Sequence, residues 1–257
     1  MKVVILAGGF GTRLGEDAVA IPKPMVEIGG YPILWHILKG YAAQGFDEFV
    51  LALGHKADVV KRHFLDYDRL AGDIVIDLRD GKVEYRRQAT EHWRVHLIDT
   101  GRDTLTGGRI RRLRPTLGGE TFMLTYGDGV SNVPIHELLA FHRARGRLAT
   151  ITVVRPPARF GGVVFDAAEE NVLGFAEKLQ VNEGWINGGF MVLEPGIFDY
   201  LAGDADVLEV DLLERLAQIG QLAAFRHEGF WQCMDTPRDR QLLERLWAEG
   251  HAPWRVW

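Results

Sequence analysis

Short apolar runs alternate with helix-like stretches along the first half of this chain, which leaves few folds open to it. Val3–Ala7 and Glu48–Leu53 are apolar runs that end at a glycine, and they predict buried strands. Amphipathic patterns predict helices over Ile33–Ala43 and Ala57–Asp66. Strands that alternate with helices of this length are joined by crossover connections, which produce a mostly parallel sheet. The sequence therefore predicts an α/β protein.

The pattern changes after Pro156, where the apolar runs become shorter and two helices are expected, over Asp211–Ile219 and Arg238–Glu249. No Ser/Pro-rich linker or repeat marks a boundary, so we expect one domain over 1–257. Within it we expect a Rossmann-like core over about 1–155, with a mixed, mostly parallel sheet flanked by helices. Smaller binding and closing elements are expected over 156–257.

Composition excludes several classes of protein. The 257 residues carry 30 Lys+Arg and 35 Asp+Glu, a formal net charge of −5, so there is no basic excess suited to nucleic acid. The single cysteine, Cys233, excludes an internal disulfide framework and a cysteine-based zinc cluster. The first apolar run is too short for a signal sequence or a membrane span. We expect a soluble, cytoplasmic protein that binds neither nucleic acid nor membrane.

The first strand runs into a glycine-rich loop, LAGGFGTRL, over residues 6–14. Glycines let backbone N–H groups approach an anion closely, although an ordinary turn also uses them. No Lys-Ser/Thr pair follows, which excludes a P-loop, and Leu14 stands where a dinucleotide fingerprint needs glycine. The cations Arg13 and Lys23 remain, and with the loop they suit a nucleoside triphosphate. Because Lys23 lies between Pro22 and Pro24, we expect an extended backbone there.

Two carboxylates occupy positions suited to a site. Asp128 follows the apolar run Phe122–Tyr126, and ligands of open α/β sheets collect at the carboxyl ends of strands. Asp235 precedes the second late helix. A simple Gly-Asp-Gly turn at Asp128 and an N-cap at Asp235 are the structural alternatives.

Other polar groups are ambiguous when they are taken alone. Arg109 follows Gly107-Gly108 and fits either a ligand contact or a basic helix face, and Glu177-Lys178 has the form of a solvated surface pair. The histidines form no zinc-binding spacing, no serine lies in a Gly-x-Ser-x-Gly elbow, and Cys233 has no base to activate it.

Taken together, these motifs resemble the signature of sugar-1-phosphate nucleotidylyltransferases, and most of all the branch that makes CDP-glucose. The resemblance spans essentially the whole chain. It rests on LAGGFGTRL (6–14), PKPMVEIGG (22–30), PILWHI (32–37), DTG (99–101), TGGR (106–109), TYGDG (125–129), EK (177–178), INGGF (186–190), GFWQ (229–232), MDT (234–236) and APW (252–254).

The resemblance implies that CTP and glucose 1-phosphate react to give CDP-glucose and pyrophosphate, with Mg²⁺ as cofactor and a homo-oligomeric enzyme. It implies catalytic roles for Arg13 and Lys23 and assigns Mg²⁺ to Asp128 and Asp235. It places the acceptor at Tyr126, Glu177, Lys178, Asn187 and Gly188. The nucleotide is assigned to Leu6, Ala7, Gly8, Gly9, Phe10, Gly11, Thr12, Arg13, Lys23, Thr100, Gly101, Arg109, Gly127 and Asp128.

One position departs from the family pattern. Relatives usually carry Glu-Lys-Pro where this chain has Glu177-Lys178-Leu179. Loss of the proline removes a φ restraint after Lys178, so a different phosphorylated or phosphonate acceptor stays open. A CTP-sensing module without catalysis is an alternative of another class. An NAD-linked oxidoreductase is disfavoured by the failed fingerprint.

Overall fold

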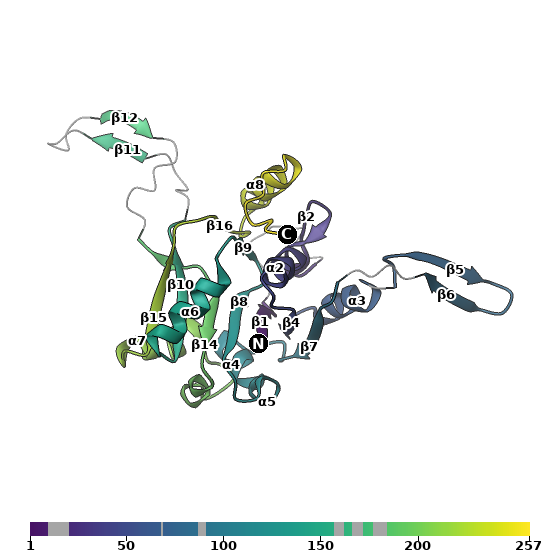
Figure 1. The fold of residues 1–257 in the computed structure, drawn as a ribbon, viewed down its shortest axis with the longest axis horizontal. Coiled ribbons are helices and arrows are strands. Elements are labelled where there is room, and N and C mark those ends of the chain that lie inside the picture. The colour runs from purple at the N-terminus through teal and green to yellow at the C-terminus, as the bar shows by residue number, and fades with distance from the viewer. Residues whose placement is uncertain (10–20, 68, 87–90, 157–161, 166–171, 177–183) are drawn as a thin grey trace.

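A computed structural model describes residues 1–9, 21–67, 69–86, 91–156, 162–165, 172–176 and 184–257. It is built around one central sheet (Figure 1). The strands follow one another across it in the order β13 (Ile186–Asn187), β10 (Ala149–Val154), β14 (Met191–Leu193), β8 (Phe122–Tyr126), β1 (Val3–Ala7), β4 (Glu48–Leu53) and β7 (Arg94–Asp99), and β15 (Leu222–His227) pairs with β10.

The strand directions confirm the predicted mixed, mostly parallel sheet. β1 lies parallel to β4 on one side and to β8 on the other, β4 lies parallel to β7, and β10 lies parallel to β15. β14 runs antiparallel to both β8 and β10. The chain therefore proceeds from β1 outward to β7 and then returns to the other side of β1. Open α/β sheets bind ligands at such a switch point, beside the carboxyl ends of the strands.

The central strands separate two hydrophobic cores. Alternate residues of a strand point to opposite faces of its sheet. In β1, Val3, Ile5 and Ala7 enter one core, while Val4 and Leu6 enter the other. Burial on both faces explains why this strand is apolar throughout, as is typical of parallel strands covered by helices on both sides.

Helices cover the sheet and connect its strands. They are α2 (Ile33–Ala42), α3 (Ala57–Tyr67), α4 (Thr106–Arg112), α5 (Arg114–Leu117), α6 (Ile135–Arg145), α7 (Arg215–Gln218) and α8 (Pro237–Ala248), with short 3₁₀ turns at Lys23–Met25 and Pro195–Tyr200. The helix predicted from Asp211 begins instead as a π-helix over Leu208–Glu214, which continues into α7. Side chains supply partners for its first backbone N–H groups: Asp211 accepts from Val207, and Thr106 accepts from Leu208.

The C-terminal segment packs onto the body through Trp254. Trp254 is only 2% exposed, and its ring stacks on Phe230 with 5.5 Å between centroids. Its indole N–H points to Nδ1 of His36 at 3.3 Å, and Nε2 of the same histidine lies 2.8 Å from the carbonyl of Ile28. Burial lowers the pKa of His36, so a neutral ring that donates from Nε2 and accepts at Nδ1 satisfies both neighbours.

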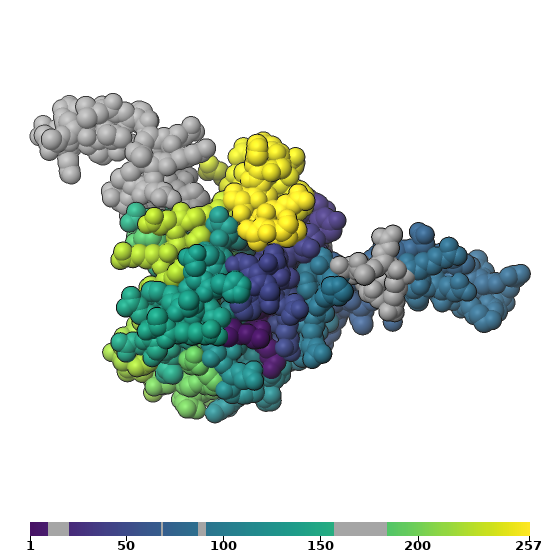
Figure 2. Space-filling model, viewed as in Figure 1, coloured from purple at the N-terminus to yellow at the C-terminus, as the bar shows by residue number. Residues whose placement is uncertain are grey.

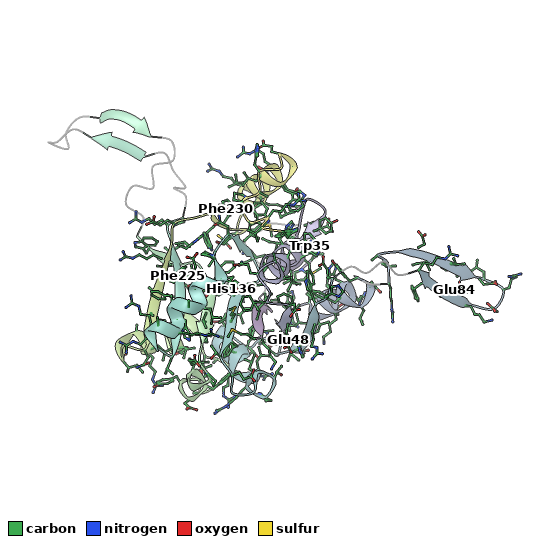
Figure 3. All side chains as sticks on the ribbon, viewed as in Figure 1. Trp35, Glu48, Glu84, His136, Phe225 and Phe230 are labelled. Carbon is green, nitrogen blue, oxygen red and sulfur yellow. The ribbon has the colours of Figure 1, made fainter. Side chains whose placement is uncertain are left out.

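Four small two-stranded sheets complete the described structure: β2 (Glu27–Ile28) with β3 (Tyr31–Pro32), β5 (Asp73–Asp77) with β6 (Lys82–Arg86), β9 (Gly129–Ser131) with β16 (Trp231–Cys233), and β11 (Gly162–Phe165) with β12 (Val172–Ala176). The β5–β6 hairpin extends away from the body (Figures 1 and 2). Glu84 lies on this hairpin, whereas Trp35 lies within the body (Figure 3). Among the described helices, none has the length and apolarity needed to cross a membrane.

Candidate active site

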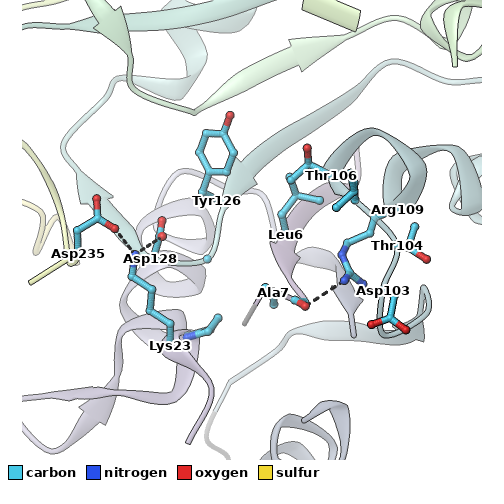
Figure 4. A pocket seen from close by; sticks show the side chains of 15 residues that line it. Leu6, Ala7, Lys23, Asp103, Thr104, Thr106, Arg109, Tyr126, Asp128 and Asp235 are labelled. Carbon is cyan, nitrogen blue, oxygen red and sulfur yellow. Dashed lines mark hydrogen bonds and ion pairs between the residues drawn. The ribbon is translucent and has the colours of Figure 1, made fainter. Parts of the chain in front are cut away.

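A pocket of about 360 Å³ opens at the switch point, beside the carboxyl ends of β1 and β8 (Figure 4). It gathers segments that lie far apart in the sequence: the end of the first strand, the turn at Lys23, the start of α4 and the segments around both predicted metal ligands. Its lining consists of Leu6, Ala7, Gly8, Gly9, Lys23, Pro24, Asp103, Thr104, Leu105, Thr106, Arg109, Tyr126, Gly127, Asp128 and Asp235.

Position 127 requires glycine because its backbone lies close to the end of β1 and to the Lys23 turn. Its N–H donates to the carbonyl of Leu6 at 3.0 Å, which ties the end of β8 to the end of β1. A Cβ at this position would lie 2.9 Å from that carbonyl oxygen and 3.1 Å from Cγ of Pro24. Any larger residue would therefore push the Lys23 turn away from the strand ends.

Pairing of β9 with β16 brings the two carboxylates together. The register places Cys233 opposite Gly129, and the N–H of Met234 donates to the carbonyl of Asp128 at 2.8 Å. Asp235 therefore comes to lie beside Asp128. The N-cap of α8 is Thr236, which forms a capping box with Asp239, so Asp235 does not serve as the cap.

The ammonium group of Lys23 lies between these carboxylates. Its Nζ is 2.6 Å from Oδ2 of Asp128 and 2.5 Å from Oδ1 of Asp235 (Figure 4). The extended path predicted for Lys23 is wrong, because the residue begins a 3₁₀ turn that continues through Pro24. Proline is tolerated in the first turn of a helix, where its missing N–H needs no partner.

The three charged side chains are partly buried. Lys23 is 12% exposed, and Asp128 and Asp235 are 31% and 25% exposed. Burial alone lowers the pKa of Lys23, but the two carboxylates outweigh it and raise that pKa above its ordinary value. The ammonium therefore stays charged at neutral pH. The two carboxylates and the ammonium group form one cluster of charges at the edge of the pocket.

Arg109 lines the pocket and holds several backbone segments of its wall together. It is 4% exposed and donates five hydrogen bonds: to the carbonyls of Gly8, Leu53, Gly101 and Arg102, and to the hydroxyl of Thr100. Burial lowers the pKa of Arg109, but an arginine side chain stays charged in proteins. A planar guanidinium with five donors can join several backbone segments in this way, which a lysine cannot do.

Glycines surround this arginine because side chains would collide with it. A Cβ at Gly8 or Gly54 would come within 2.5 Å or 2.3 Å of the guanidinium. The Gly107-Gly108 pair has another cause, since a Cβ at Gly108 would lie 2.4 Å from the carbonyl oxygen of Asp204. These glycines therefore allow close packing of α4 against the 204–206 loop.

Tyr126 lines the side of the pocket where an acceptor is predicted to bind. Its hydroxyl accepts a hydrogen bond from the side chain of Asn187 at 3.1 Å and donates one to Glu209. Asn187 also accepts from the N–H of Gly189 at 3.0 Å, and the carbonyl of Gly188 accepts from Trp231 at 2.8 Å. The segment that carries Asn187 is thus held in place directly behind Tyr126.

The structure brings together most of the predicted residues that it describes. Of these, ten line the pocket, whereas Thr100, Gly101, Asn187 and Gly188 lie behind its wall. Outside the described residues lie the predicted positions Phe10, Gly11, Thr12, Arg13, Glu177 and Lys178.

Residues 103–105, which precede α4, and Thr106, its first residue, line the pocket but were not predicted as site residues. Their only sequence signal is their position directly before the Gly107-Gly108 pair. Glu209, which lies on the π-helix, was missed as well. Burial raises the pKa of Cys233 to about 12, with the nearby Asp235 adding to the effect, so this residue is a neutral thiol at neutral pH.

The position of Arg109 leads to a stability prediction. Arg109→Lys removes most of its five hydrogen bonds and leaves buried carbonyls without partners, so we expect a loss of about 2–3 kcal/mol in the free energy of unfolding. Urea unfolding of both proteins measures this loss. Arg111→Lys on the exposed side of the same helix is the matched control and should change stability by less than about 0.5 kcal/mol. Equal losses in the two variants would contradict the structural role of Arg109.

Sequence comparisons identify relatives over the whole chain. The model of the nucleotidyl transferase family matches residues 2–236. A glucose-1-phosphate cytidylyltransferase of Salmonella typhi is 45% identical over 100% of both chains. A probable glucose-1-phosphate cytidylyltransferase of Bacillus subtilis is 42% identical, again over 100% of both chains.

The fold is shared with solved structures as well. The crystal structure of HddC from Yersinia pseudotuberculosis matches with a TM-score of 0.71 at 24% identity, covering 96% of this chain and 99% of that one. At this identity the likeness concerns the fold alone. The match of the family model and the full-length relatives settle the family: this chain is a member of the nucleotidyl transferase family.

Proposed function

We propose that this chain joins CTP and α-D-glucose 1-phosphate to give CDP-glucose and pyrophosphate, in a reaction that depends on Mg²⁺. One observation carries the proposal: a single pocket joins the glycine end of β1 to a lysine and two carboxylates. The names of the two full-length relatives support the choice of CTP and glucose 1-phosphate.

The chemistry is an in-line displacement at the α-phosphorus of CTP. A phosphate oxygen of the sugar phosphate forms a new bond to that phosphorus, while the bond to the bridging oxygen breaks and pyrophosphate leaves with the electron pair. A phosphate monoester is already ionised near pH 7, so no general base is needed. Phosphoryl-type transfer depends mainly on positioning and on stabilising negative charge.

The residues divide these tasks in the proposal. Backbone N–H groups of Gly8 and Gly9, together with the loop that continues to Arg13, hold the triphosphate. Lys23 and Arg13 stabilise charge on the transferring and leaving phosphates. Residues of about 1–155 then bind the nucleotide, while those of 156–257 complete the acceptor side with Lys178 and close the site.

Asp128 and Asp235 are the residues that would hold Mg²⁺. The donor set supports this fit, because both carboxylates reach the same cationic atom, Nζ of Lys23, and their oxygens therefore converge on one point. Mg²⁺ commonly takes one or two carboxylates and completes its octahedron with phosphate oxygens and water. When bound, the ion supplies charge neutralisation and orientation of the phosphates.

The proposal also covers assembly and location: a homo-oligomer in the cytoplasm that binds neither nucleic acid nor membrane. The β5–β6 hairpin supports the oligomer. It extends from the body with Ile74, Val75, Ile76 and Val83 exposed, and a two-stranded hairpin alone is only marginally stable in water. Contact with a second copy would bury these side chains.

A substrate panel tests the proposed reaction. Pyrophosphate release is measured with CTP, UTP, GTP, ATP and dTTP, each combined with several sugar 1-phosphates and a phosphonate acceptor. We expect the highest kcat/KM with CTP and glucose 1-phosphate, and no release without Mg²⁺. CTP binding without pyrophosphate release from any acceptor would instead favour a sensing module.

Variants test the division of roles. We expect Lys23→Ala to lower kcat by about 10²–10³-fold with a much smaller change in the KM for CTP, because its cation acts on charge that develops in the transition state. Lys39→Ala is the matched control, since Lys39 also pairs with a carboxylate, Glu91, but lies outside the pocket.

The double variant Asp128→Ala/Asp235→Ala should abolish Mg²⁺-dependent pyrophosphate release. Full activity of this variant would reject the metal assignment, and unchanged kinetics of Lys23→Ala would remove that lysine from the mechanism. Urea unfolding of each variant shows whether any loss reflects misfolding.

A further inference from the structure

Glu209 lies behind the acceptor side of the pocket without lining it. It is the second residue of the π-helix Leu208–Glu214, and π-helical turns are frequent at functional sites. Its two carboxylate oxygens contact two different hydroxyl groups, those of Tyr126 and Thr106, and both of these residues line the pocket.

The neighbouring groups fix the direction of the hydrogen bond to Tyr126. Asn187 accepts from the N–H of Gly189 with Oδ1, so its Nδ2 is the group that faces Tyr126. An amide N–H₂ can only donate, and an ionised carboxylate can only accept. The tyrosine hydroxyl therefore accepts from Asn187 and gives its single proton to Glu209.

Thr106 shows the same polarity. Its hydroxyl oxygen accepts from the N–H of Leu208 at 2.9 Å and lies 3.4 Å from the second carboxylate oxygen of Glu209. Its proton is thus directed to Glu209 as well. Each hydroxyl has two lone pairs, of which one is used by these contacts. One lone pair on each residue is left for a ligand.

We propose that Glu209 is a positioning residue that turns the hydroxyls of Tyr126 and Thr106 into hydrogen-bond acceptors on the pocket wall, so that the pocket selects an acceptor molecule carrying hydroxyl donors. This inference rests on the proposed function and deepens it, because a sugar 1-phosphate offers such donors. Removal of the carboxylate frees both protons and leaves the hydroxyls able to donate or to accept. The pocket then loses its preference for donors.

Deoxyfluoro analogues of glucose 1-phosphate test this directly, because fluorine can accept weakly but cannot donate. The ratio of kcat/KM for glucose 1-phosphate to that for each monodeoxyfluoro analogue is measured in the wild type and in Glu209→Ala. At the contacted position we expect the ratio to fall by about tenfold in the variant, which is the size of one hydrogen bond. The KM for CTP should change by less than about twofold, since the nucleotide loop is not involved.

Two further variants separate selection from general damage. Glu209→Gln keeps one acceptor oxygen, so its ratio should lie between those of the wild type and Glu209→Ala. Glu214→Ala, exposed on the same helix, is the matched control and should keep the ratio of the wild type. Ratios that are the same in the wild type and Glu209→Ala at every sugar position would overturn the proposal.

Failure of the proposed function can be distinguished from failure of the inference about Glu209. If the wild type does not use glucose 1-phosphate, that function fails, and the ratios are measured with fluorinated forms of the acceptor that the wild type prefers. Unfolding of Tyr126→Phe, Glu209→Ala and the double variant requires no turnover. We expect the double variant to lose less than the sum of the two single losses. Strictly additive losses would overturn the inferred contact, whatever acceptor is used.

Discussion

The ion pairs of Lys23 with Asp128 and Asp235 are the interaction on which the arrangement of this site depends. The lysine is 105 residues from one partner and 212 from the other, so the contact joins three distant parts of the chain at one point. Removing one member of a partly buried group of charges leaves the others without compensation, which is costly. In the proposed function the same three side chains would hold phosphate and a divalent ion, and the fold brings these charged groups together.

The topology explains why they meet at this place. Parallel strands present their carboxyl ends at one edge of the sheet, and the chain reverses direction beside β1. Gly8 follows β1 and Gly127 follows β8 at this point. Arg109 donates hydrogen bonds to the carbonyls of Gly8 and of Leu53, which ends β4. A buried cation that bonds to several carbonyls is a rigid support. The ends of β1 and β4 are therefore held together by the side chain of Arg109 in the pocket wall.

Much of the fold was predictable because its signals are local. The strands Val3–Ala7, Glu48–Leu53 and Phe122–Tyr126 have the predicted bounds, since apolar runs ending at glycine are clear signals. The candidate site residues were predicted from the family resemblance and their roles stay predictions, but the structure gathers those it describes in or beside one pocket. The Lys23 turn was predicted as extended because adjacent prolines indicate only what an isolated peptide prefers, whereas its 3₁₀ geometry depends on packing against the strand ends.

The role of Glu209 lay beyond sequence reasoning because it depends on distant partners: Tyr126 is 83 residues away and Thr106 is 103 residues away. No local pattern shows that a helical glutamate meets two hydroxyls of another part of the fold. The same holds for the hydrogen bonds of Arg109 to distant carbonyls, which its neighbouring glycines do not reveal, while its contact with a ligand stays a prediction. Hydrogen bonds between residues that are distant in the sequence produce no local sequence pattern from which they could be predicted.

A crystal structure of the protein with CTP and Mg²⁺ would show whether Lys23, Asp128 and Asp235 belong to the nucleotide-binding site. We expect the triphosphate to lie in the pocket beside Gly8 and Gly9, with Lys23, Asp128 and Asp235 all in contact with the bound phosphates or the ion. A nucleotide bound elsewhere, with the ammonium of Lys23 still held between the two carboxylates, would contradict this expectation.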